Sequence, residues 1–129
     1  MDLTFAFAVD GDNRFQKKHF GDARKFLIYK INHGQLHFIG EERNVFRDLD
    51  KVLKHGSGKK GLAIIDFLKG KEVNVLVSVM FGKNIQLVNQ HFIPVEVPLM
   101  ELEKVREIIS RHLHWIAEEW DKPTGAHKK

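Results

Sequence analysis

Large and small side chains alternate at the start of the chain, in residues 3–9. The large residues are Leu3, Phe5, Phe7 and Val9, and the small residues between them are Thr4, Ala6 and Ala8. A repeat of two is the repeat of a β-strand, in which successive side chains point to opposite faces of the sheet. We therefore predict a strand here, and its small face leaves room for a helix to lie on it.

Two further strands follow as a hairpin. Residues 25–31 and 35–41 have the composition of strands, and the Asn-His-Gly sequence at residues 32–34 is typical of a tight turn. Residues 10–18 are polar and rich in turn formers, which predicts an exposed loop ahead of the hairpin. The N-terminal half of the chain is therefore expected to be mainly sheet.

The middle of the chain has the spacing of helices. Apolar residues recur at helical intervals at Val45, Leu49, Val52 and Leu53, and again at Leu62, Ile65, Phe67 and Leu68. The Gly-Ser-Gly sequence at residues 56–58 separates the two sets. We predict two helical segments joined by a flexible connector.

A strand, a helix and a second strand are predicted next. Residues 73–79 are nearly all apolar, as in a strand that is buried on both faces. Gly82 opens a helical segment that ends near residue 90, and residues 92–97 form a short strand. Because proline cannot donate a hydrogen bond to a neighbouring strand, Pro94 indicates an edge or irregular position.

One long amphipathic helix is predicted at the end of this pattern. Its apolar stripe consists of Leu102, Val105, Ile109, Leu113, Ile116 and Trp120. The stripe can pack against the body of the protein or against a partner, including a second copy in a homodimer. Trp115 and Trp120 lie at different angles around the helix, so at least one is a candidate for exposure, although such a tryptophan commonly covers the edge of a core.

This order of elements predicts an α/β protein. The strand–helix–strand units need right-handed crossovers, and we expect one mixed sheet of about five strands with flanking helices. A length of 129 residues and a hydrophobic fraction of 43% suit one domain. We place the domain at residues 1–121 and expect residues 122–129, which contain a proline, a glycine and three lysines, to form a disordered basic tail.

Composition excludes several classes of chemistry. The chain has no cysteine, so disulfides, thiolate ligation of zinc or of iron–sulfur clusters and cysteine nucleophiles are ruled out. The net charge of +4 comes largely from short lysine clusters; it permits an anionic ligand and does not favour nucleic acid. No stretch is apolar enough to span a membrane and the N-terminus is unlike a signal peptide, so we expect a cytoplasmic protein.

An ordered set of motifs carries a family resemblance. The first strand is followed by the loop His19-Phe20-Gly21, the strand at residues 26–29 and the turn His55-Gly56-Ser57-Gly58. In this order, over residues 2–97, they resemble the nitrogenase iron-molybdenum cofactor biosynthesis domain family. The resemblance implies a ribonuclease H-like fold and a small carrier of metal clusters or their precursors. It also implies that the loop of His19, Phe20 and Gly21 binds the cofactor, with His19 as the metal ligand.

The residues themselves leave two interpretations of His19. An imidazole is a good ligand for transition metals, and Gly21 gives the loop freedom to direct it into a cleft. A loop histidine can equally do no more than bond nearby backbone. The sequence shows no second ligand beside it, because Asp10, Asp12 and Asp22 are also what turn chemistry places in loops.

His55 and Gly82 are secondary candidates for cofactor binding. In the resembled family the segment of His55 faces the same side as the His-Phe-Gly loop, although the segment can also be a plain connector between helices. Gly82 follows a predicted buried strand, where ligands often bind, or serves only the turn into the next helix. Family members commonly carry more glycine just before this point, whereas Val79, Met80 and Phe81 stand here and would reshape a pocket.

The leading functional hypothesis is a noncatalytic carrier of an iron-molybdenum-type or iron–sulfur cluster, or of its precursor. Such a carrier would exchange its cargo with donor and acceptor proteins. The alternative is a cargo-free interaction or regulatory domain on the same fold, with self-association through the last helix.

A metal-dependent nuclease is disfavoured. Asp10 and Asp66 are its only candidate carboxylates. Asp10 begins a turn, Asp66 lies in a predicted helix, and no further carboxylates complete a two-metal site.

Overall fold

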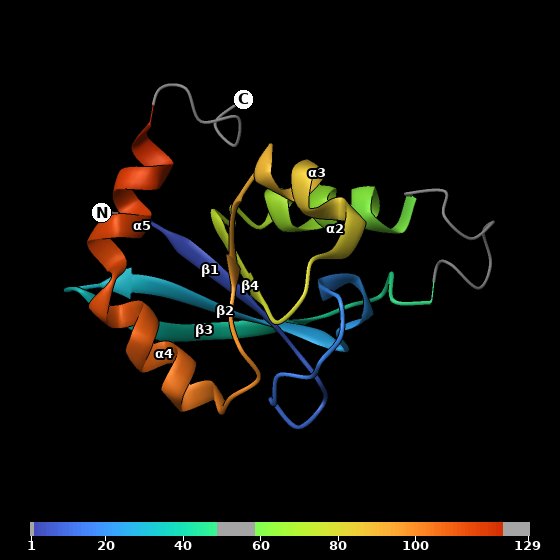
Figure 1. The fold of residues 1–129 in the computed structure, drawn as a ribbon, viewed down its shortest axis with the longest axis horizontal. Helices are drawn as coiled ribbons and strands as arrows, with labels where there is room; N and C mark the ends of the chain where they lie inside the picture. Colours follow the sequence, from blue (N-terminus) through green and yellow to red (C-terminus); the bar gives the residue numbers. More distant parts are fainter. Residues whose placement is uncertain (1, 49–58, 123–129) are drawn as a thin grey trace.

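The protein is built on one mixed sheet. The structure, a computed structural model, describes residues 2–48 and 59–122 (Figure 1). Its five strands lie in the order β3-β2-β1-β4-β5. They are β1 (Thr4–Val9), β2 (Lys25–Asn32), β3 (Gln35–Arg43), β4 (Val75–Ser78) and β5 (Ile93–Glu96). The predicted mixed α/β architecture is confirmed.

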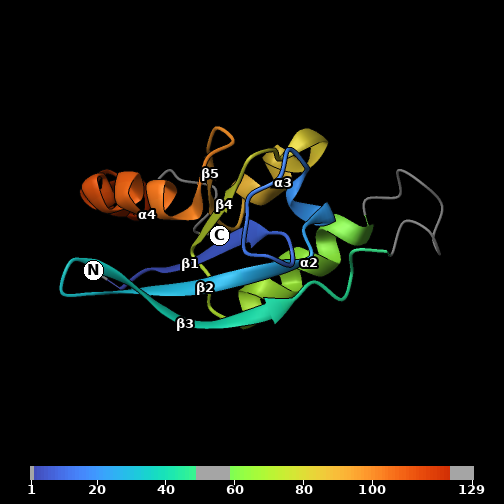
Figure 2. The ribbon, with the colours of Figure 1, turned by 90° about the horizontal axis from the view of Figure 1, so that it is seen from below.

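The helices connect and cover these strands. The α-helices are α2 (Lys59–Gly70), α3 (Ile85–Asn89), α4 (Leu102–Arg111) and α5 (Leu113–Asp121), and the short 3-10 helices are η1 (Phe20–Asp22) and η2 (Gly82–Asn84). Figure 2 shows α4 and α2 on opposite sides of the sheet. None of the helices in the described part of the chain is long and apolar enough to cross a membrane.

The sheet changes direction at β1. The strands β1, β2 and β3 pair antiparallel, whereas β4 runs parallel to β1 and β5 parallel to β4. The predicted hairpin turn has positive φ at both central residues, 53° at His33 and 73° at Gly34, as in a type I′ turn. The carboxyl ends of β1, β4 and β5 therefore meet at one edge of the sheet.

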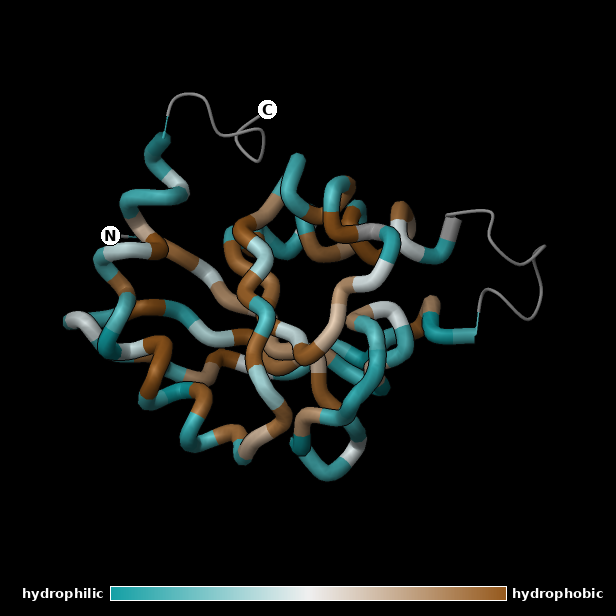
Figure 3. Tube along the Cα trace, viewed as in Figure 1, coloured by the Kyte–Doolittle hydropathy of each residue, from teal (hydrophilic) through white to brown (hydrophobic). Residues whose placement is uncertain are grey.

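The two faces of β1 pack as their side chains predict. Phe5, Phe7 and Val9 on the large face share a buried cluster with Val105 and Ile109 of α4. Phe5 and Phe7 are fully buried, and burying such a side chain stabilises the fold by about 1.5–3 kcal/mol. In Figure 3 the apolar positions are concentrated along these central strands, and the loop after β1 is hydrophilic.

The small face of β1 lies under α2. Ala6 and Ala8 belong to a second buried cluster with Ile64, Ile65 and Leu68 of that helix. A helix can approach the sheet closely only where the side chains beneath it are small. The prediction that alanines at this face make room for a helix is confirmed.

Both edge strands among the described residues carry an interruption. Ile93 of β5 and Val97, the residue after this strand, donate their N–H groups to the carbonyls of Asn74 and Ser78, at 2.9 and 3.0 Å. Pro94 lies between them, so its missing donor is on the side away from β4, and the predicted edge position is confirmed. In β3, Ile39 forms a bulge, because Gly40 pairs with Ile28 while Phe38 pairs with Tyr29.

The prediction of one continuous closing helix is wrong. The helix ends at Arg111 and restarts at Leu113, because His112 has φ −120° and ψ 18°, outside the helical range. The carbonyl of His112 accepts from the N–H groups of Trp115 and Ile116, at 3.1 and 3.2 Å, which starts α5. The buried stripe continues across the break at Ile109 and Leu113.

Other element boundaries differ from expectation by a few residues. The strand predicted at residues 73–79 is shorter, and both its faces are buried as predicted. The segment after Gly82 begins as a 3-10 turn before α3. Residues 45–48 form a turn where a helix was predicted, and the rest of that segment, the Gly-Ser-Gly connector and most of the predicted tail lie outside the described residues.

Candidate cofactor-binding site

His19 lies at the edge of the sheet where β1 and β4 end. The loop after β1 brings His19 beside Met80, with which it forms an isolated parallel bridge. The N–H of Phe20 donates to the carbonyl of Met80 at 3.0 Å. Ligands of open α/β sheets commonly bind at the carboxyl edge of parallel strands. The exposed imidazole of His19 is therefore held at the edge where a ligand is expected.

The imidazole of His19 rests on Gly82. A Cβ atom placed on Gly82 would lie 2.9 Å from Nε2 and 3.0 Å from Cε1 of the ring, closer than real side chains approach. Gly82 also has φ 63°, in the left-handed region that favours glycine. Two candidate residues from distant parts of the sequence are thus in contact, and each limits where the other can be.

Phe20 anchors the loop to the core of the protein. Its ring is buried, with its centroid 5.8 Å from that of the buried Phe81. Phe81 therefore points into the core, whereas Val79 and Met80 of the same step are half-buried. Phe20 supports His19 through packing and presents no polar atom of its own to a ligand.

Gly21 is tied to the end of β3 by Asn44. The buried side-chain amide of Asn44 donates to the carbonyls of Gly21 and Ala23, at 3.0 and 2.8 Å. A Cβ on Gly21 would lie 3.2 Å from Cε of Lys60, whose ammonium pairs with Asp22. The short helix η1 is thus fixed on two sides, by a buried amide and by an ion pair to α2.

Asp10 fixes the other end of the loop. Its carboxylate pairs with Lys18 at 3.6 Å and with Arg24 at 4.0 Å, and its backbone N–H donates to the carbonyl of Arg14 at 2.9 Å. These contacts give Asp10 a structural role beside the histidine. Asp66 is an exposed residue of α2. Residues 2–48 and 59–122 contain no group of three or more His, Asp or Glu side chains that could hold a metal ion.

The sequence-predicted site is assembled only in part. The structure brings together His19, Phe20, Gly21 and Gly82. His55 lies outside the described residues.

Asn44 is the supporting residue that the sequence analysis missed. It stands alone after a strand, and no periodicity or motif distinguishes its buried amide from a surface one. Only its buried position in the structure, where it donates to two carbonyls, reveals what it does.

Comparison with known families agrees with this geometry. The family model described as dinitrogenase iron-molybdenum cofactor matches residues 1–113. The chain belongs to this family. The match extends from β1 through the first residue of α5 and so includes every element that positions His19. No curated protein matches the chain. Membership connects the protein with the handling of iron-molybdenum cofactor.

Proposed function

We propose that the protein is a noncatalytic carrier that holds an iron-molybdenum-type or iron–sulfur cluster, or its precursor, through His19. The observation that carries the proposal is the contact between the exposed imidazole and Gly82 at the carboxyl edge of β1 and β4. The family match supports this class of cargo.

A single imidazole suits cargo that must be passed on. Structural metal sites commonly use about four protein ligands and bind too tightly for rapid exchange. This chain has no cysteine, and its described residues contain no group of three or more His, Asp or Glu side chains that could hold a metal ion. Cargo held by His19 would therefore keep open positions for a donor or an acceptor protein. Lys17 lies two residues before His19, and Lys83 directly follows Gly82. Both are exposed, and their charge favours an anionic cluster.

An anaerobic binding titration tests the proposal. Wild-type protein and His19→Ala are mixed with iron–sulfur or iron-molybdenum cofactor precursors, and retained metal is measured by metal analysis and visible absorption. We expect retention near one cluster per chain to fall at least about tenfold in the variant, with the free energy of unfolding changed by less than about 0.5 kcal/mol.

His37→Ala is the matched control, because His37 is exposed on β3 and lies outside the site. It should retain cargo like wild type. Equal retention by wild type and His19→Ala would remove His19 from the mechanism, and no retention by either would disprove the carrier function.

A cargo-free interaction domain is the second candidate. It is favoured by an apolar groove of about 390 Å³ between β5 and the two closing helices. Trp115 at its rim is 59% exposed, and Leu99, beside the groove in sequence, is also 59% exposed. Contiguous apolar surface that stays exposed commonly marks a site of protein–protein association. Self-association through α5 would cover them.

Three finer features complete the proposal. The ribonuclease H-like architecture is supported by the strand order β3-β2-β1-β4-β5 with one antiparallel half. The domain limits at residues 1–121 and a cytoplasmic location remain proposals of the sequence.

A further inference from the structure

Met80 is the residue that the backbone pairs with His19, and the bridge between them is parallel. Opposite residues of a parallel pairing direct their side chains to the same side, because successive side chains alternate along each segment. Neighbouring strands lie about 4.8 Å apart. The thioether of Met80 and the imidazole of His19 thus start from adjacent backbone positions and extend to the same side.

The residue that follows each member of the pair supports this direction. Phe20 and Phe81 are buried, and their ring centroids are 5.8 Å apart. His19 has an extended backbone, with φ −64° and ψ 152°, so its side chain points away from that of Phe20. The imidazole is exposed and Met80 is half-buried. The pair therefore lies at the surface, beside the aromatic contact that fixes both segments to the core.

The backbone of Met80 is held in place by two hydrogen bonds. Its carbonyl accepts from the N–H of Phe20 and from the hydroxyl of Ser78, each at 3.0 Å. Ser78 is itself buried at the end of β4. Among the described residues, neither buried apolar cluster has Met80 as a packing partner, whereas Met100 packs against the cluster that includes α4. The chain thus fixes the position of Met80 without using its side chain to fill the core.

A thioether and an imidazole are a suitable pair of ligands for a metal cluster. Thioether sulfur is a soft ligand of the kind that iron–sulfur clusters accept, and imidazole binds iron and other transition metals. Both ligands are neutral, so they add no negative charge to a cluster that is already anionic. The methionine side chain has three rotatable bonds, which lets its sulfur adjust to a metal beside His19.

We propose that Met80 is a second ligand at this site, and that its thioether sulfur binds the cluster that His19 anchors. The inference rests on the carrier function proposed above. It accounts for how a chain without cysteine offers sulfur to its cargo. Two neutral ligands from different segments hold one cluster more firmly than a single imidazole does, and they leave the remaining metal positions open to a partner protein.

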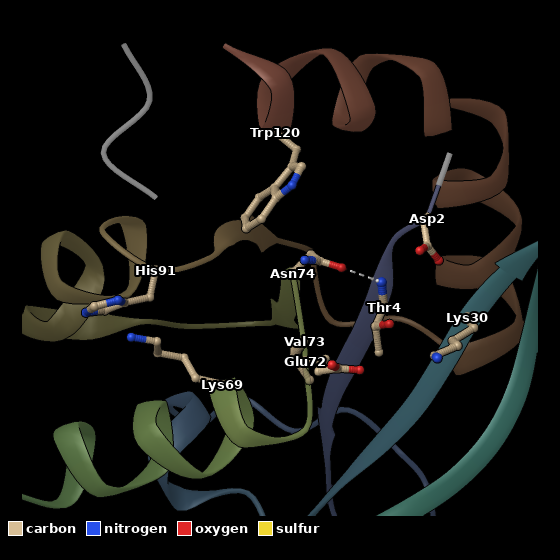
Figure 4. A pocket seen from close by; sticks show the side chains of 9 residues that line it. All are labelled: Asp2, Thr4, Lys30, Lys69, Glu72, Val73, Asn74, His91 and Trp120. Atoms are coloured by element: carbon tan, nitrogen blue, oxygen red, sulfur yellow. Dashed lines mark hydrogen bonds between the residues drawn. The ribbon is translucent and has the colours of Figure 1, made fainter. Parts of the chain in front are cut away.

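His91 provides a comparison, because it has no such neighbour. It lies beside Lys69 in a cavity of about 400 Å³ at the start of β1 (Figure 4). No methionine is among the described residues that line this cavity. His91 is therefore a control for a histidine of the same chain without an adjacent thioether.

Selenium labelling tests the inference directly. Protein with selenomethionine in place of methionine is loaded anaerobically with isolated iron-molybdenum cofactor, and X-ray absorption is recorded at the selenium edge. The Met100→Leu background leaves Met80 and Met1 as the selenium sites. We expect an iron or molybdenum atom bonded to selenium, and we expect this neighbour to be lost when Met80→Leu is added. A role of Met80 in packing alone would give no such neighbour.

Cofactor retention gives the second measurement. Met80→Leu nearly conserves the volume of the side chain, so it should keep the wild-type unfolding midpoint. It should nevertheless weaken cofactor binding about tenfold, because one metal–ligand bond is lost. Met100→Leu and His91→Gln are the controls, and both should retain cofactor like wild type.

The outcomes separate this inference from the carrier function. Retention that depends on His19 but not on Met80, with no metal neighbour at selenium, would overturn the role of Met80 and leave the carrier function intact. No retention by the wild type would disprove the carrier function and this inference with it.

Discussion

Gly82 shows how much of the proposed site depends on one residue. Its φ of 63° and its contact with the imidazole of His19 each disfavour a Cβ atom at this residue. A residue with a side chain would have to meet the backbone cost of the left-handed region and displace the ring. The observed position of the His19 ring therefore depends on the absence of a side chain at Gly82 as well as on the loop that carries the histidine.

Gly82→Ala should lower both stability and cargo retention. The left-handed region costs a non-glycine residue about 1–2 kcal/mol, and the displaced imidazole should reduce metal retention several-fold. Unfolding in urea and the anaerobic titration measure the two effects. Gly40→Ala is the control, since a Cβ there meets nothing within 4 Å. A Gly82→Ala protein that keeps wild-type stability and retention would show that the contact is dispensable.

His91 should make stability depend on pH. Burial lowers its pKa in the folded state below the ordinary 6.5, so the unfolded chain binds a proton more readily. The stabilising contribution is complete above about pH 6.5 and is lost as the pH falls through the folded-state pKa.

The comparison of wild type with His91→Gln measures this effect. The difference in unfolding free energy between the two proteins should shrink as the pH is lowered from 7.5 to about 5. A difference that stays constant over this range would contradict the assignment.

At the scale of elements, alternation and spacing predicted the strands well because packing follows side-chain size directly. The alanines of β1 face α2. Pro94 lies at a position of the edge strand β5 where no hydrogen bond to β4 needs its N–H group. The break at His112 left no such trace, because the apolar stripe runs across it unchanged and neither glycine nor proline marks it.

The candidate site was predictable only as separate pieces. His19 and Gly82 meet because β1 pairs with β4, and no local pattern encodes that pairing. Asn44 was missed for the same reason. Its amide reaches the carbonyls of Gly21 and Ala23, which are distant in sequence, only when the sheet brings these segments together.

At the scale of the whole molecule, the groove beside α5 allows a test of self-association. If α5 mediates a homodimer, sedimentation should show a dimer for wild type and a monomer for Trp115→Ala, because the exposed indole is the largest apolar group at the rim. Leu62→Ala, which removes an apolar side chain 47% exposed on α2, should leave the dimer intact. A monomeric wild type at high concentration would exclude this mode of association.

The two edges of the sheet limit how the protein can meet other chains. A bulge at Ile39 interrupts β3, and Pro94 removes a donor from the outer side of β5. Neither strand presents the unbroken row of donors and acceptors that a further strand would need. Both interruptions therefore oppose the addition of a further strand, which favours the loops and helices as the surfaces for recognition.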